Sequence, residues 1–183
     1  MASTPASSIR RRVPFVLGLF AAAALAAARP GGADAIDRFY RVNEQVATGA
    51  QPTVSQIADL AREGFRTIMN LREPGEYDSA AEEAAARELG LRYVSIPVKT
   101  ADPKVEQLDA FLNATADPTI YPAFLHCGSG NRVGAFWMVR RVLVDGWSVP
   151  DAETEAVQIG MKSPNLREFA LDYIQRHAKS TAR

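Results

Sequence analysis

The sequence from position 121 to position 144 reads YPAFLHCGSGNRVGAFWMVRRVLV. Its apolar start, Tyr121 to Leu125, predicts a buried strand, and its apolar end, Val133 to Val144, predicts a helix. The loop between them contains two glycines, Gly128 and Gly130. A strand, a glycine-rich loop and a helix N-terminus in this order form an anion cradle, because free backbone N–H groups and the positive end of the helix dipole converge there.

Cys127, the single cysteine of the chain, stands at the mouth of this cradle, and Arg132 stands at its far end. A lone cysteine is often buried and inert, but the neighbouring helix N-terminus favours a thiolate nucleophile here. The guanidinium of Arg132 is a planar fork that binds two oxygens of one oxyanion. We therefore predict Cys127 as the nucleophile and Arg132 as the clamp. The residues expected to bind the substrate oxygens are Gly128, Ser129, Gly130, Asn131 and Arg132.

Two further side chains of the loop have alternative roles. His126, directly before the nucleophile, either organises the loop by bonding its backbone or is a histidine satisfied at a strand end. The side chain of Asn131 either bonds its own loop or caps the following helix, so its contribution to the substrate is expected through its N–H group. We predict His126 as a loop-organising residue.

The rest of the chain alternates short apolar runs with amphipathic segments. Thr53 is expected to cap one helix, Ser79 and Glu82 to form the capping box of another, and Asp102 to cap a third before Pro103. Strands that alternate with helices indicate an α/β fold, with a mostly parallel central sheet flanked by helices. The expected strands are Phe39–Val42, Gln45–Thr48, Phe65–Leu71, Leu91–Val98 and Tyr121–His126, and helices are expected over 53–64, 79–90, from 102 onward, and over 133–145, 150–159 and 164–178.

The first 35 residues have the layout of a secretory signal peptide. A basic cluster, Arg10-Arg11-Arg12, precedes an apolar run over 13–28, and Ala33-Asp34-Ala35 is a small-x-small cleavage site. The apolar run is shorter than the roughly 20 residues that a membrane-spanning helix needs. We expect a signal peptide over 1–35, one domain over 36–183 and a periplasmic or secreted location, with an uncleaved membrane anchor as the alternative.

Composition argues against several classes of protein. The 21 basic and 21 acidic residues cancel, and no basic stripe interleaves with aromatic residues, so no nucleic-acid partner is expected. The two histidines and one cysteine have no metal-ligand spacing, and neither a metal nor another cofactor is expected. No stable membrane insertion is expected after the leader is cleaved.

The pattern His126-Cys127-x-x-Gly130-x-Arg132 after a short strand resembles the signature of the cysteine-dependent protein tyrosine phosphatase superfamily. The resemblance extends over most of the chain, from Phe39 to Tyr173. The most similar group is the compact bacterial branch that includes the phosphatase-like domain of beta-lactamase-hydrolase-like proteins. The flanking stretches that resemble small dual-specificity-like phosphatases are Tyr40-Arg41-Val42, Gly49-Ala50-Gln51-Pro52, the run from Gly64 to Arg72, and the run from Tyr93 to Val98.

The resemblance implies a cysteine-dependent, tyrosine-specific or dual-specificity phosphatase. It would hydrolyse phosphate monoesters of proteins or small molecules through a thiophosphate intermediate on Cys127. In this superfamily an aspartate on a mobile loop protonates the leaving oxygen, because an alkoxide or phenoxide leaves poorly. The matching position is Asp102, for which the helix cap before Pro103 is the alternative role.

Two departures from the superfamily's pattern keep other functions open. Four residues separate Cys127 from Arg132, whereas the usual loop has five, and this spacing also resembles rhodaneses, which carry a persulfide on their cysteine. Val133 stands where a serine or threonine often stabilises the thiolate when the phosphoenzyme breaks down. The alternatives are a rhodanese-like sulfurtransferase and a phospho-ligand binding module with little turnover.

Overall fold

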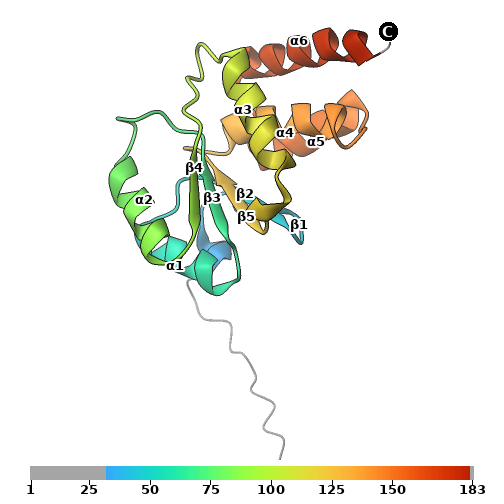
Figure 1. The fold of residues 1–183 in the computed structure, drawn as a ribbon. Coiled ribbons are helices and arrows are strands. Elements are labelled where there is room, and N and C mark those ends of the chain that lie inside the picture. The colour runs from blue at the N-terminus through green and yellow to red at the C-terminus, as the bar shows by residue number, and fades with distance from the viewer. Residues whose placement is uncertain (1–31, 182–183) are drawn as a thin grey trace, which may run out of the picture.

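The strand that precedes Cys127, β5 (Ala123–His126), lies in the middle of a five-stranded sheet (Figure 1). The computed structural model describes residues 32–181 and orders the sheet β1-β2-β5-β3-β4. β1 (Tyr40–Asn43) and β2 (Val46–Gly49) form an antiparallel hairpin, whereas β3 (Thr67–Asn70) and β4 (Arg92–Ser95) are parallel to their neighbours. The predicted mostly parallel central sheet is confirmed.

The carboxyl ends of the four parallel strands lie at one edge of the sheet. His126 is in register with Gly49 of β2 and with Asn70 of β3, and Asn70 is in register with Ser95 of β4. The segments that follow these strands therefore meet Cys127 at the same edge. In sheets of this kind ligands bind outside the carboxyl ends of the strands, which places the candidate site here.

Helices cover both faces of the sheet (Figure 1). α1 (Val54–Arg62) and α2 (Ser79–Glu88) pack on one face, and α3 (Val105–Ala116), α4 (Asn131–Leu143), α5 (Val149–Ile159) and α6 (Pro164–Thr181) pack on the other. Side chains alternate along a strand. Phe124 and His126 therefore face α1 and α2, whereas Leu125 and Cys127 face the larger helical layer. The two short 3-10 helices are η1 (Ala33–Ala35) and η2 (Pro118–Ile120).

Local capping explains where α1 and α2 begin. Thr53 caps α1 and forms a capping box with Gln56, so the predicted cap is confirmed. The capping box predicted for Ser79 and Glu82 is wrong. Asp78 caps α2 by accepting the N–H of Ala81, and Glu82 is buried instead, where the interior supplies polar partners that the helix start does not.

The predicted starts of α3 and α4 also shift. Asp102 does not cap α3, because the side chain of Gln107 bonds the N–H of Lys104 at 2.9 Å and the helix therefore begins at Val105. α4 begins at Asn131, earlier than expected, because Gly130 adopts a left-handed conformation that starts the helix directly after the loop. This earlier start includes Arg132 in the first turn of α4.

α4 is the central helix of the larger layer. Its residues from Arg132 to Val139 are all buried, which is typical of a helix surrounded by other elements. It approaches α5 closely at Gly134, where a Cβ would lie 2.5 Å from the carbonyl oxygen of Ala156. The position of the first turn of α4 is therefore fixed by packing along the whole helix.

The predicted signal peptide lies almost entirely outside the described residues, so cleavage and export stay predictions. Its last three residues form η1, in which Ala33 is buried and donates its N–H to Oε1 of Glu63 at 2.7 Å. Within the described range, 32–181, no helix combines the length and the hydrophobicity that a membrane span requires.

Candidate active site

The loop from Cys127 to Gly130 joins the carboxyl end of β5 to the first turn of α4. Gly130 has a φ of +78°, and a Cβ there would lie 2.1 Å from the carbonyl oxygen of Ile159. Only glycine permits such an approach of two backbones. Cys127 is buried, and the first N–H groups of α4 lack partners within the helix and point back toward the loop. The segment thus combines a thiol with the elements of an anion cradle.

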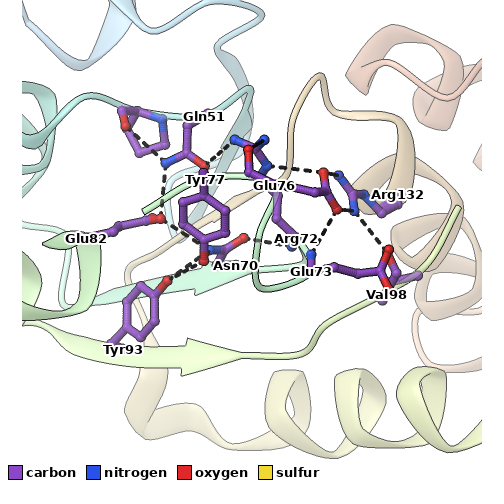
Figure 2. A network of polar contacts seen from close by, with 11 residues as sticks. Gln51, Asn70, Arg72, Glu73, Glu76, Tyr77, Glu82, Tyr93, Val98 and Arg132 are labelled. Atoms are coloured by element: carbon purple, nitrogen blue, oxygen red, sulfur yellow. Dashed lines mark hydrogen bonds and ion pairs between the residues drawn. The ribbon is translucent and has the colours of Figure 1, made fainter. Parts of the chain in front are cut away.

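The side chain of Arg132 is buried and held from two sides (Figure 2). Its Nη1 and Nη2 donate to Oε1 and Oε2 of Glu76 at 2.5 and 2.8 Å, and Nη1 also donates to the carbonyl oxygen of Val98 at 2.9 Å. The same Nη2 lies 3.6 Å from where a Cβ of Gly128 would be. The fork therefore reaches back to the start of the loop, in an orientation that Glu76 and Val98 determine.

Glu76 is a site residue that the sequence did not reveal. It belongs to the connection between β3 and α2, which lies between the strand expected over Phe65–Leu71 and the helix expected over 79–90. The side-chain hydrogen bonds from Arg132 lower the pKa of Glu76 to about 2, and the N–H of Glu73 contributes to the same effect. The carboxylate is therefore charged at neutral pH. The sequence feature that could have identified Glu76 as a site residue is its position after a parallel strand, since the connections that follow such strands meet at one edge of the sheet.

Arg72, which follows β3, is a second cation beside the loop. Its Nε lies 3.9 Å from where a Cβ of Gly128 would be and 3.3 Å from Oε2 of Glu76. Its Nη1 donates to Oε1 of Gln51 at 3.0 Å, and its guanidinium lies 4.7 Å from the ring centre of Tyr77. Glu76 thus lies between two arginines that both approach the loop. Their positive charges favour an anionic ligand there.

His126 is completely buried and lies on the opposite face of the sheet from the thiol. Its Nε2 lies 2.6 Å from Oε1 of Glu82, although the pair lacks the alignment of a hydrogen bond, and its ring stacks on Phe124. The other oxygen of Glu82 accepts from Gln51 at 3.1 Å and from Asn70 at 3.2 Å. Sequence reasoning missed this role because it assigned Glu82 to the helix start.

Asn70 ends β3 and joins two tyrosines to this cluster (Figure 2). Its Nδ2, which has two hydrogens, lies within hydrogen-bond distance of Glu82 and of the hydroxyl groups of Tyr77 and Tyr93, and these two hydroxyl oxygens lie 3.0 Å apart. Burial raises the pKa of both tyrosines, so their hydroxyl groups stay protonated. The Oδ1 of Asn70 accepts the N–H of Arg72 at 2.8 Å, which turns the chain after β3 toward the Cys127 loop.

The side chain of Asn131 has a structural role, but neither of the two expected ones. Its Oδ1 accepts the N–H groups of Lys162 and Ser163 at 2.9 and 3.1 Å. It therefore anchors the segment between α5 and α6 to the first turn of α4. The binding of substrate oxygens by the N–H groups of this loop stays a prediction.

Asp102 lies on the connection between β4 and α3. Its carboxylate pairs with Nζ of Lys104 at 2.5 Å, and 59% of its side chain is exposed. Within the described part of the chain, the recorded partner of this carboxylate is Lys104 and not Cys127 or Arg132. The connection starts at Val98, whose carbonyl oxygen accepts from Arg132. Asp102 therefore lies four residues after a residue that contacts Arg132, but its own carboxylate does not contact the loop.

No group of three or more histidine, cysteine, aspartate or glutamate side chains among residues 32–181 is arranged to hold a metal ion. The polar groups at the edge of the sheet instead pair with one another. The chemistry that this arrangement offers is a thiol, two guanidinium groups and backbone N–H groups around one loop.

A parallel sheet with Cys127 after its central strand and an arginine in the next helical turn defines the cysteine-dependent fold of the protein tyrosine phosphatase superfamily, bacterial branch. Residues 38–144 match the family model described as beta-lactamase hydrolase-like protein, phosphatase-like domain, and the chain belongs to this family. It is 36% identical over 124 residues to the beta-lactamase hydrolase-like protein of Xylella fastidiosa. That match covers 66% of this chain and 28% of the relative, so the chain corresponds to about a quarter of such proteins.

Solved structures share the fold. The catalytic domain of the PP-IP phosphatase SIW14 from S. cerevisiae, in complex with citrate, has a TM-score of 0.65 at 19% identity, covering 80% of this chain and 94% of that one. TpbA of P. aeruginosa, in complex with pTyr, has a TM-score of 0.59 at 22% identity, covering 81% and 91%. At these identities the likeness establishes the fold and not the substrate.

Proposed function

We propose that this chain is an exported cysteine-dependent phosphatase that hydrolyses phosphate monoesters. The observation that carries the proposal is the buried, oriented fork of Arg132, which reaches back to Gly128 beside the thiol of Cys127. A clamp prepared in this way binds a tetrahedral anion without reorganisation during the reaction.

In the proposed reaction, the thiolate of Cys127 attacks phosphorus in line with the leaving oxygen. A sulfur–phosphorus bond forms, the phosphorus–oxygen bond breaks, and the released alkoxide or phenoxide takes a proton from Asp102. Water, deprotonated by Asp102, then attacks the thiophosphate and releases inorganic phosphate and the thiolate. Arg132 and the N–H groups of residues 128–132 stabilise the charge on the three equatorial oxygens.

Asp102 reaches the leaving oxygen only if its connection moves. Its pair with Lys104 is exposed, and an exposed ion pair contributes about 0–1 kcal/mol, so little opposes its separation. The tether of Val98 to Arg132 keeps the start of this connection at the clamp. An anion bound by Arg132 would lie close to the base of the moving segment.

The substrate class is inferred from the ligands and activities of proteins with the same fold. TpbA binds pTyr and SIW14 is a PP-IP phosphatase, which favours a phosphorylated protein or small molecule here, with a tyrosine-specific or dual-specificity activity. Val133 is fully buried and has no hydroxyl group to offer the departing thiolate. We therefore expect slow breakdown of the thiophosphate.

Hydrolysis of an aryl phosphate by the full chain, under reductant and with a chelator present, tests the proposal. We expect release of the phenol by the wild type and by Asp102→Asn at a reduced rate, and none by Cys127→Ser. The intact mass of Asp102→Asn is expected to increase by one phosphoryl group during turnover. An inactive wild type that binds phosphate esters tightly would indicate a binding module instead.

A second candidate function is sulfur transfer, because Cys127 and Arg132 have the rhodanese-like spacing of four residues. The thiolate would take the outer sulfur of thiosulfate, releasing sulfite, and would pass it from the persulfide to cyanide as thiocyanate. Thiocyanate formation without any aryl phosphate hydrolysis, together with a stable persulfide mass on Cys127, would favour the sulfurtransferase over the phosphatase.

Export rests on the leader over 1–35. We expect the mature protein to begin at Ile36 and to be recovered from the periplasm or the medium. Full-length protein in the membrane fraction would instead indicate an uncleaved anchor.

A further inference from the structure

Six side chains form a continuous series of polar contacts from one end of the Cys127 loop to the other. We call this series the polar belt; its members, in order, are His126, Glu82, Gln51, Arg72, Glu76 and Arg132. Successive contacts measure 2.6, 3.1, 3.0, 3.3 and 2.5 Å. Figure 2 shows the part from Glu82 to Arg132. Its two ends are the residue before the thiol and the last residue of the anion cradle.

We propose that Glu82 is a positioning residue for Cys127. It holds the ring of His126 with a hydrogen on Nε2 and couples this end of the loop to the Glu76–Arg132 pair through Gln51 and Arg72. The proposal rests on the function proposed above for Cys127, and it adds a residue that touches neither the substrate nor the thiol.

The hydrogen on Nε2 follows from the partners of Glu82. An ionised carboxylate only accepts hydrogen bonds, and Oε2 of Glu82 already accepts from the amide groups of Gln51 and Asn70. Its Oε1 lies 2.6 Å from Nε2 of His126, a distance at which two lone pairs would repel each other. One of these two atoms must therefore carry a hydrogen, and the proposal places it on Nε2, with the carboxylate oxygen as the acceptor. Because the partner of a ring nitrogen selects the tautomer, Glu82 determines how His126 is protonated.

A glutamine at position 82 cannot replace both carboxylate oxygens of Glu82, because only one end of its amide group is an acceptor. If its oxygen faces Gln51 and Asn70, its NH2 group faces Nε2 of His126, and the ring must then move its hydrogen to Nδ1. If its oxygen faces His126, its NH2 group meets two other NH2 groups. Glu82→Gln is nearly isosteric, so it changes the hydrogen pattern with little change in volume.

His126 transmits this constraint through the backbone. Its ring is fixed on the α2 face of the sheet by Glu82 and by stacking on Phe124, and its carbonyl oxygen accepts the N–H of Leu71 at 2.9 Å. The next residue, Cys127, directs its thiol to the other face. Loss of the anchor at His126 therefore shifts the thiol relative to a clamp that α4 holds in place.

Two features of the composition make the test specific. The chain has one cysteine, so alkylation by iodoacetamide followed by mass spectrometry reports on Cys127 alone. It has two histidines, so long-range 1H–15N spectra resolve the tautomer of His126 once a variant assigns it. Glu83→Gln is the matched control, because Glu83 lies next to Glu82 on α2, but 42% of its side chain is exposed and it pairs with Arg87.

We expect Glu82→Gln to move the hydrogen of His126 to Nδ1 and to lower both the alkylation rate and kcat by on the order of tenfold, with KM nearly unchanged. Glu83→Gln should behave as the wild type in all three measurements. An unchanged tautomer, or an unchanged alkylation rate with a changed tautomer, overturns the proposal. If the wild type hydrolyses no phosphate ester but the alkylation rates differ as expected, the proposed function fails and the role of Glu82 stands.

Gln51→Leu provides a second test that leaves both carboxylates of the belt in place. Glu82 and Glu76 are connected through Gln51 and Arg72, and a second route runs from Glu82 through Asn70 to the N–H of Arg72. The effects of Glu82→Gln and Glu76→Gln on the alkylation rate should be non-additive with Gln51 present, and the non-additive part should become smaller in the Gln51→Leu background, where only the route through Asn70 remains. Additive effects in both backgrounds overturn the coupling through the belt, even if Glu82→Gln alone is poorly folded.

Discussion

Glu76→Gln tests whether the carboxylate between Arg132 and Arg72 stabilises the clamp. Side-chain hydrogen bonds from Arg132 are the main reason why the pKa of Glu76 falls from 4.5 to about 2. At about 1.4 kcal/mol per pH unit, this difference corresponds to about 3.5 kcal/mol. About a third of the Glu76 side chain is exposed, and Glu73 and Arg72 supply part of the effect. Solvent screening therefore reduces the expected loss to about 1–2 kcal/mol.

The pH dependence of this loss has a defined sign. A carboxylate whose pKa is lowered by folding stabilises the protein above its ordinary pKa, and this stabilisation disappears as the pH falls through the lowered value. For Glu76 the window runs from 4.5 down to about 2. The unfolding free energies of wild type and Glu76→Gln should therefore differ fully at pH 7 and converge as the pH falls through this window.

Urea unfolding at pH 7, 4.5 and 3 measures this convergence. Glu73→Gln is the control, because Glu73 bonds Glu76 through its backbone N–H, at 2.9 Å, and not through its side chain. We expect Glu73→Gln to be as stable as the wild type. Equal stability of Glu76→Gln and wild type at pH 7, or a loss of the same size at pH 3, would refute the reasoning.

Two further predictions concern the loop. Gly130→Ala should lower the unfolding free energy by more than about 3 kcal/mol, because its Cβ would overlap a carbonyl oxygen. Gly75→Ala is the control: Gly75 has a φ of +95° but open space around it, so the same urea experiment should show a loss of only about 1 kcal/mol. Comparable losses would show that backbone strain, and not overlap, excludes a side chain at Gly130. Asn131→Ala should cost about 0.5–1.5 kcal/mol by calorimetry, since two backbone N–H groups that are not fully buried lose their acceptor. Asn131→Asp should restore most of this loss; an equally unstable Asn131→Asp would contradict this account.

The local sequence was sufficient for the elements and for the centre of the site. Alternating apolar runs predict the strands, including the two short ones on either side of Asn43 and Glu44 that form the hairpin of β1 and β2. The order of strand, glycine-rich loop and helix placed Cys127 and Arg132 at the two ends of one loop. These predictions succeed because hydrophobic periodicity and glycine conformations act over a few neighbouring residues.

Capping rules failed where a polar side chain was needed in the interior. Ser79 and Glu82 have the spacing of a capping box, yet Glu82 is buried against His126. Local spacing cannot show this, because the partner of Glu82 is more than 40 positions away in the sequence. Asp102 is likewise expected to cap α3 from its local position before Pro103, but the N-cap residue of α3 is Lys104.

The sequence by itself therefore determined the α/β class, the order of its strands and helices, and the thiol and arginine of one anion-binding loop. Only the tertiary structure decided which side chains surround that loop. Gln51 follows β2, whereas Arg72 and Glu76 follow β3, and they meet because the parallel strands end at a common edge of the sheet. The buried Glu82 contacts His126, and Glu76 pairs with the buried guanidinium of Arg132, at the two ends of the loop that the sequence had already marked, because polar groups taken from water need polar partners.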